Sequence, residues 1–176
     1  MKVFGIATAL FFSICGSVSA QSVKTETEAS NGVQLTIHRD DFAGRSEITA
    51  PSLSAGPLGF AFVATITQNG KPGPLMIVGS VSYSGEWRYY NSAILRGGEA
   101  VEGIFNDRDV VSCRGSRYSG CSLREGFQLL PSAEQIEKYA LNGMLSIQLR
   151  ARSGAPVVLE IPVSHIEAVI EAAGSN

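Results

Sequence analysis

Two cysteines and four arginines gathered in one short stretch are the side chains of this sequence best suited to chemistry or recognition. Seven residues rich in Gly and Ser separate Cys113 from Cys121, a spacing that favours a loop at the end of a β-hairpin. The same stretch contains Arg108, Arg114, Arg117 and Arg124. Two cysteines in an exported chain are most simply one disulfide. We predict that a Cys113–Cys121 bond closes this loop and contributes about 2.5 kcal/mol to stability.

The closed loop is the best candidate for a binding surface. Arg114 and Arg117 can each hold a carboxylate or phosphate through paired hydrogen bonds. Tyr118 adds an aromatic face, and Tyr with Arg is a common anchor pairing at protein interfaces. The alternative is a solvated loop kept soluble by its charges. We expect these three residues, with Arg108 and Arg124 beside them, to contact a protein partner or an anionic ligand of the cell envelope.

Catalytic chemistry has few candidates in this sequence. A nucleophile needs an adjacent base, but His38 and His165 are the only imidazoles and no Gly-x-Ser-x-Gly elbow is present. Glu125 falls on the apparent inward face of its strand, where a charge needs a partner. Arg88, Arg96 or Arg108 would supply one, so a structural ion pair is favoured over an acid catalyst. The enzymatic alternative is an envelope hydrolase that uses Glu125 or an aspartate of residues 107–109.

No metal site or cofactor is predicted. The two histidines lie far apart in the sequence, and no Cys-x-x-Cys pair accompanies them, so a structural zinc site is not expected. Carboxylates cluster at residues 40–41 and 107–109, where they would suit Ca²⁺. Asp and Asn are, however, also ordinary residues of turns.

The first twenty residues have the pattern of a cleaved signal peptide. Lys2 precedes an apolar run from Val3 to Ile14, and small residues follow at Val18-Ser19-Ala20. The run is shorter than the roughly 20 residues that a membrane-spanning helix needs. We expect cleavage near Ala20, a periplasmic or secreted protein, and no membrane span.

The charge of the remaining chain argues against nucleic-acid binding. Loss of Lys2 would leave 13 basic against 16 acidic side chains, a net charge of −3. Nucleic-acid-binding domains are normally basic. The length of the chain fits one domain, which we place at residues 33–176 after a flexible polar leader at residues 21–32.

Alternating apolar residues predict a meander of antiparallel strands. In one of them, Leu58, Phe60, Phe62, Ala64 and Ile66 share a face. Asn106-Asp107 is expected to end the fourth strand of the central region. Gly- and Pro-rich turns recur about every ten residues. We expect strands near residues 33–37, 47–50, 58–66, 75–83, 87–95, 101–105, 110–113, 123–129, 145–149 and 157–161.

Two short helices interrupt the strands. Ser132 and Gln135 form a capping box before a helix at about residues 132–142. Ser164 and Glu167 form a second one before a helix at about 164–173. The fold class is therefore mainly β: a single-domain antiparallel sandwich or partly open barrel with two helices and one disulfide.

Two resemblances bear on function. Residues 113–173, with Gly120-Cys121 and Ile161-Pro162-Val163-Ser164 before a final helix, resemble the C-terminal half of the invasion-associated locus B family. That family implies a small exported β-rich protein and no catalytic residues. The segment 115–120 is similar to the loop that periplasmic lysozyme inhibitors insert into an enzyme cleft. The sequence thus favours a non-enzymatic exported binding protein, with an inhibitor of a cell-wall lytic enzyme as a further alternative.

Overall fold

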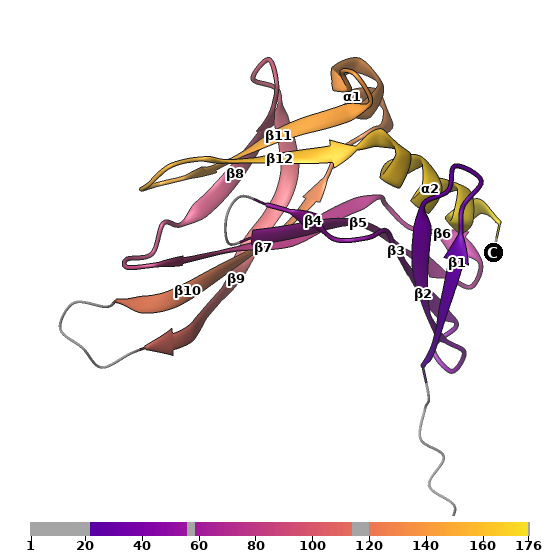
Figure 1. Ribbon diagram of the computed structural model, residues 1–176. Helices are drawn as coiled ribbons and strands as arrows, with labels where there is room; N and C mark the ends of the chain where they lie inside the picture. Colours follow the sequence, from indigo (N-terminus) through magenta and orange to yellow (C-terminus); the bar gives the residue numbers. More distant parts are fainter. Residues whose placement is uncertain (1–21, 56–58, 114–119, 176) are drawn as a thin grey trace, which may run out of the picture.

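The alternating segments of the sequence form an open antiparallel β-sandwich with two short helices (Figure 1). The computed structural model describes residues 22–55, 59–113 and 120–175. Within these ranges twelve strands form one sheet, and ten of them follow a continuous path whose ends do not meet. The expected fold class is confirmed as a mainly β protein, with an open sheet and not a closed barrel.

The strands follow one another along the sheet in the order β1-β2-β3-β5-β7-β10-β9-β8-β11-β12, and the two short strands β4 and β6 pair with β5. Every pairing is antiparallel. Their bounds are β1 Val23–Glu28, β2 Gln34–Asp40, β3 Arg45–Thr49, β4 Leu53–Ser54, β5 Gly59–Gln68, β6 Lys71–Pro72, β7 Met76–Ser84, β8 Tyr90–Leu95, β9 Ala100–Cys113, β10 Cys121–Leu130, β11 Met144–Ala151 and β12 Val157–Pro162.

The long strand β9 joins the two layers of the sandwich. Its first two residues pair with β8 in the layer β8-β11-β12. From Glu102 to Cys113 it pairs with β10 in the larger layer, which consists of β10, β7, β5, β3, β2 and β1. Strands that pass from one sheet to the other are the usual way in which a single sheet folds over to enclose a core.

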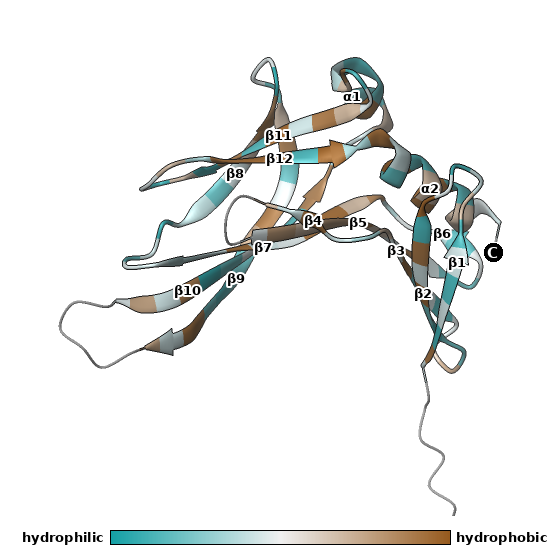
Figure 2. Cartoon of the chain, in the orientation of Figure 1, coloured by the Kyte–Doolittle hydropathy of each residue, from teal (hydrophilic) through white to brown (hydrophobic). Residues whose placement is uncertain are grey.

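The core lies between these layers and is closed at one end by helix α2 (Val163–Gly174). On β5 the core face carries small side chains, Ala61, Val63 and Thr65, all buried. Ile166 and Val169 of α2 are buried as well. Brown (apolar) and teal (hydrophilic) segments alternate along the strands in Figure 2, whereas helix α1 (Ala133–Tyr139) is largely hydrophilic.

A single carboxylate anchors helix α1 to the turn before β9. Glu99 accepts hydrogen bonds from the Tyr139 hydroxyl at 2.6 Å, from Gln135 Nε2 at 3.0 Å and from Lys138 Nζ at 3.1 Å. These donors, with Tyr139 contributing most, lower the pKa of Glu99 to about 2. The capping box of Ser132 and Gln135 forms as predicted, so Gln135 both caps the helix and docks it.

The structure differs from the sequence-based predictions at five places. The strand expected at residues 87–95 begins only at Tyr90, because the Tyr89 and Tyr90 amides turn toward Glu125. The expected leader contains β1, which pairs with β2 but buries no side chain, so no alternating pattern marks it. Strand β9 runs through Asn106-Asp107 without ending there. Helix α1 ends at Tyr139, before the Asn142-Gly143 turn. Helix α2 has Pro162 at its N-cap with no side-chain cap, so the second predicted capping box does not form.

Candidate functional site

Glu125 is the centre of a buried hydrogen-bond network. The side chain lies on β10 and is 2 % exposed. One carboxylate oxygen accepts from the Tyr83 hydroxyl and from the Tyr89 amide at 2.9 Å. The other accepts from the Tyr90 amide at 3.0 Å and from Arg108 Nε at 3.2 Å. Since each oxygen already has two donors, this arrangement supports the structural ion pair expected for Glu125, with Arg108 as the partner.

Tyr83 is held in its neutral form, in which its hydroxyl can donate to Glu125. Burial, followed by the hydrogen bond to Glu125, raises the pKa of Tyr83 to about 12. The Arg88 amide donates to the same hydroxyl at 3.0 Å, and the Arg88 guanidinium lies 4.4 Å over the ring. The network thereby fixes the segment between β7 and β8 against β10.

Tyr89 has a backbone conformation that sequence reasoning did not anticipate. Its φ is +57°, in the left-handed region that residues other than glycine rarely adopt. This left-handed turn directs the consecutive amides of Tyr89 and Tyr90 at the Glu125 carboxylate. Such a conformation typically costs about 1–3 kcal/mol. The hydrogen bonds to a buried charge offset that cost, which explains why a tyrosine occupies a position that favours glycine.

The end of the β9–β10 hairpin is closed by the predicted disulfide, and its β10 strand also pairs with β7 as far as Ser122. Cys113 and Cys121 are bonded and lie directly opposite each other in the two strands. The hairpin projects at the left in Figure 1. From Asn106 to Cys113 all side chains of β9 are exposed, including the apolar Val110 and Val111. We call this hairpin, residues 106–113 with 120–124, the arm.

The five predicted binding residues do not all belong to one described surface. Arg108 is engaged by Glu125, and its guanidinium lies 5.2 Å over the Tyr89 ring. Arg124 pairs on the surface with Asp109 at 2.9 Å. The remaining three, Arg114, Arg117 and Tyr118, lie outside the described residues.

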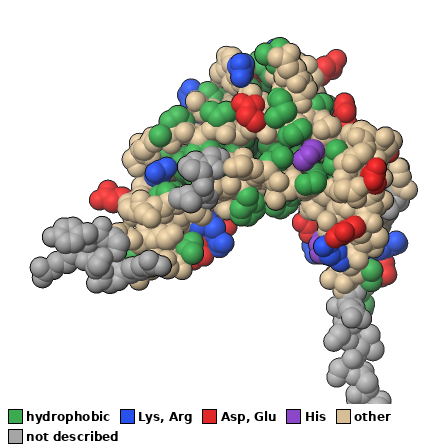
Figure 3. Space-filling view, in the orientation of Figure 1, with side chains coloured by type: hydrophobic (Ala, Val, Ile, Leu, Met, Phe, Trp, Pro, Cys, Tyr) green, Lys and Arg blue, Asp and Glu red, His purple; other side chains and the backbone are tan. Residues whose placement is uncertain are grey.

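The larger layer has a second face, opposite the core, that no described element covers in Figure 1. We call it the open face. Cross-strand pairing places Phe62, Val78, Gln128 and Ile104 side by side in one row across it. The neighbouring row is Phe60, Ser80, Gly126 and Asp107. In Figure 3 this face forms the underside of an arch, with hydrophobic side chains at the roof and charges of both signs on the two flanks.

Two phenylalanines dominate the centre of the open face. Phe60 and Phe62 project from the same side of β5, with ring centroids 6.3 Å apart and ring planes within 3° of parallel. Phe60 is 46 % exposed and Ile104, farther along the face, is 49 % exposed. Scattered apolar side chains on a surface are ordinary, but a contiguous group of them marks an interaction site.

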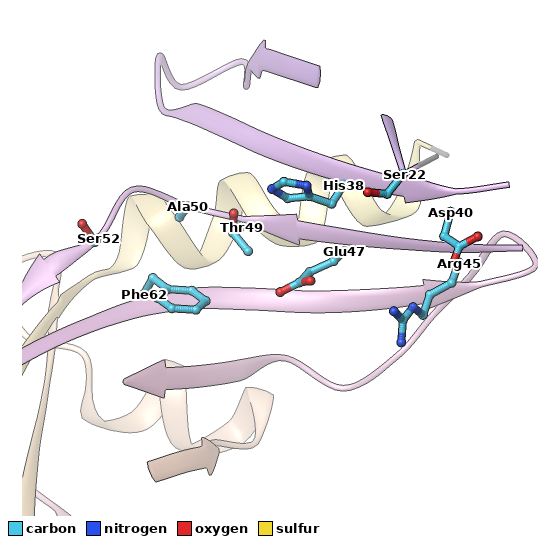
Figure 4. Close-up of a pocket in the computed structure, with 9 residues that line it drawn as sticks. All are labelled: Ser22, His38, Asp40, Arg45, Glu47, Thr49, Ala50, Ser52 and Phe62. Carbon is cyan, nitrogen blue, oxygen red and sulfur yellow. The ribbon is translucent and has the colours of Figure 1, made fainter. Parts of the chain in front are cut away.

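A polar hollow of about 540 Å³ lies at one end of the open face (Figure 4). His38 of β2 and Glu47 of β3 are cross-strand neighbours, and Asp40 and Arg45 form the next pair. His38, Glu47 and Phe62 lie on the same side of three adjacent strands in Figure 4. The hollow is lined by Ser22, His38, Asp40, Arg45, Glu47, Thr49, Ala50, Ser52 and Phe62.

A smaller hollow of about 190 Å³ lies toward the arm. The polar side chains of Asn106, Asp107 and Gln128 line it beside Val78 and Ile104. Polar groups thus stand on both sides of the aromatic pair. The larger hollow is not evident from the sequence, because His38 and Glu47 become neighbours only through the register of β2 and β3.

Neither a protein-family model, nor a characterised protein, nor a solved structure matches the chain. Among the described residues no helix is both long and apolar enough to cross a membrane. Within the same ranges no group of three or more His, Cys, Asp or Glu side chains is placed to hold a metal ion.

Proposed function

We propose that the chain is an exported, non-enzymatic binding protein whose partner lies across the open face and reaches the arm. The observation that carries this proposal is the aromatic pair on the open face, where Phe60 is 46 % exposed and the row of Phe62 leads through Val78 and Gln128 to the exposed Ile104. A sandwich that leaves such a row on one of its outer faces has apolar surface available for a partner.

Export is supported by two features. The leader of residues 1–20 has the composition of a cleaved signal peptide. The Cys113–Cys121 disulfide is of a kind that persists in oxidising compartments such as the periplasm. The resemblance of residues 113–173 to the invasion-associated locus B family implies the same kind of small exported protein.

Both carboxylate oxygens of Glu125 are occupied by hydrogen-bond donors of the protein, which favours the binding function over the hydrolase alternative. A general acid must present a carboxyl oxygen to substrate at hydrogen-bond distance, and both oxygens of Glu125 are occupied by the protein itself. Of the aspartates at residues 107–109, Asp109 is paired with Arg124. These contacts support structural roles for Glu125 and Asp109.

The arm favours a second form of the proposal, an inhibitor of a cell-wall lytic enzyme. A stapled hairpin that projects from a rigid body can enter a cleft with little loss of conformational entropy. Val110, Val111 and the predicted anchors Arg114, Arg117 and Tyr118 would then make the contact. In this form the open face lies beside the enzyme and the arm inside it.

Capture from periplasmic extract with paired variants tests the proposal. Phe60→Ser with Ile104→Ser removes the two large apolar side chains that are most exposed on the open face. Val158→Ser with Ile170→Ser is the matched control, since these residues are 47 % and 55 % exposed on other surfaces. Because interface anchors are each worth about 2 kcal/mol or more, capture should fall at least tenfold for the open-face variant and stay unchanged for the control. Equal capture by the parent and the open-face variant, at equal melting temperatures, would contradict the proposal.

A further inference from the structure

We propose that the ligand of the open face is a glycan chain, an inference that rests on the proposed binding function. Three features of the face point to this class of ligand: the aromatic pair, the polar side chains that flank it, and the mixture of charges among those side chains.

The aromatic pair supplies an apolar platform of the kind that sugar rings use. A pyranose ring carries C–H groups on its face, and the face of an aromatic ring is the negative part of its quadrupole, which attracts them. Phe60 and Phe62 lie parallel, with centroids 6.3 Å apart, on a face that no described element covers in Figure 1. The stacked pair therefore offers one apolar strip along β5 against which a sugar ring can pack.

The flanking side chains offer both donors and acceptors. In the larger hollow Asp40 and Glu47 can only accept hydrogen bonds when ionised, whereas Arg45 can only donate. One oxygen of Asp40 already accepts hydrogen bonds from the Phe42 and Ala43 amides, at 3.1 and 3.0 Å. Sugar hydroxyls both donate and accept, so a hydroxyl-rich ligand suits Glu47, the other oxygen of Asp40 and Arg45 together. Beyond the aromatic pair, the second hollow adds the amides of Asn106 and Gln128.

The charge balance of the hollow disfavours a strongly charged ligand. Two carboxylates, Asp40 and Glu47, stand beside one guanidinium, Arg45, and one imidazole, His38. The side chains of Asp40 and Arg45 come from adjacent positions of β2 and β3, as do those of His38 and Glu47. A ligand with a dense negative charge would meet a carboxylate in either pair, and one with a dense positive charge would meet Arg45. A polar chain with little net charge meets none, which favours a glycan over an acidic or basic peptide.

The test uses three defined hexasaccharides and the full exported protein. Hexamers of β-1,4-linked N-acetylglucosamine, β-1,4-linked glucose and α-1,4-linked glucose are titrated to about 10 mM, which is tenfold above a dissociation constant of about 1 mM. Amide chemical shifts of the isotope-labelled protein are followed throughout. We expect at least one hexamer to bind and to shift the signals of His38, Glu47, Phe62 and Ile104.

The variant Phe60→Leu with Phe62→Leu separates a glycan from a generic apolar partner. It keeps the apolar surface but removes the aromatic rings, so sugar binding should weaken at least tenfold while the melting temperature changes little. The matched control, Phe42→Leu, replaces a fully exposed phenylalanine in the turn between β2 and β3. It should leave binding unchanged.

Three results would overturn the inference: no hexamer binds, the leucine variant binds as tightly as the parent, or the shifted signals lie on the outer face of β8, β11 and β12. The binding function itself is judged separately. If no sugar binds but Phe60→Ser with Ile104→Ser abolishes capture of a protein, the glycan is excluded and the binding function stands. If neither experiment shows an effect, both fail.

Discussion

Glu125 and Arg108 face each other across β10 and β9, and their ion pair ties a buried carboxylate to a side chain at the base of the arm. The Glu125 side chain is 3 % exposed and that of Arg108 is 34 % exposed, with 3.2 Å between Oε2 and Nε. The pair thus connects the interior of the sandwich to the hairpin that carries the disulfide. Its contribution to stability can be measured directly.

Glu125→Gln is expected to lower the free energy of unfolding by about 3–5 kcal/mol, since it leaves Arg108 without its buried partner and points an amide donor at other donors. Urea unfolding of parent and variant gives the difference. Asp109→Asn is the control, because it breaks the exposed pair with Arg124, which is worth about 1 kcal/mol or less. A Glu125→Gln variant as stable as the control would mean that the network is not a structural centre.

Tyr83→Phe should cost about 1–3 kcal/mol, because it deprives Glu125 of one donor and the Arg88 amide of its acceptor. The folded pKa of Tyr83, about 12, lies above the unfolded value of 10. The stabilisation is therefore complete below pH 10 and is lost as the pH rises toward 12. The free energy of unfolding is measured from pH 8 to 12 for both proteins. The difference between the parent and Tyr83→Phe should shrink between pH 10 and 12. A constant difference across that range would contradict the assigned role of the hydroxyl.

Glu99→Gln is expected to lower the melting temperature at neutral pH by loosening helix α1. The folded pKa of Glu99, about 2, lies below its usual value of 4.5. The stabilisation is therefore present above pH 4.5 and is lost as the pH falls toward 2. Melting curves of parent and variant should converge over that range. Glu102→Gln, an exposed carboxylate on β9, is the control and should show no such convergence.

Replacing Cys113 and Cys121 with alanine should lower the free energy of unfolding by about 2.5 kcal/mol without changing the fold. Leu123 belongs to the buried core and Cys121 packs against it, but most of the core lies between the two layers outside the arm. Circular dichroism and urea unfolding test both parts of this expectation. Thiol titration of the unfolded, unreduced parent should find no free cysteine; two free thiols would contradict the bond.

The alternation of apolar residues predicted most strands, but it could not show which face of β5 is covered. Phe60 and Phe62 share a face with Ala64 and Ile66, as the sequence indicates. The opposite face, with Ala61 and Val63, is the one that packs against the core. Small side chains allow the layers to approach closely, so the larger residues are left on the open face. Periodicity alone carries no information about this choice.

Tertiary contacts decided the features that the sequence missed. Asn106-Asp107 has the composition of a turn, yet β9 continues through it with an irregular register against Gly126 and Gln128. The hollow around His38 depends on the register of strands whose pairing is not encoded locally. The need of Glu125 for a partner, by contrast, was predictable because a buried charge must be paired.

Site-specific photo-crosslinking in the native cell tests the central claim that the open face and the arm form the contact surface. A photoreactive side chain is placed in turn at Phe60, Ile104 and Val111, and at Leu141 and Ile170 on other surfaces, where 57 % and 55 % of the side chain is exposed. We predict discrete adducts from the first three positions and none from the other two. Adducts from Leu141 and Ile170, with none from Phe60 and Ile104, would contradict the claim.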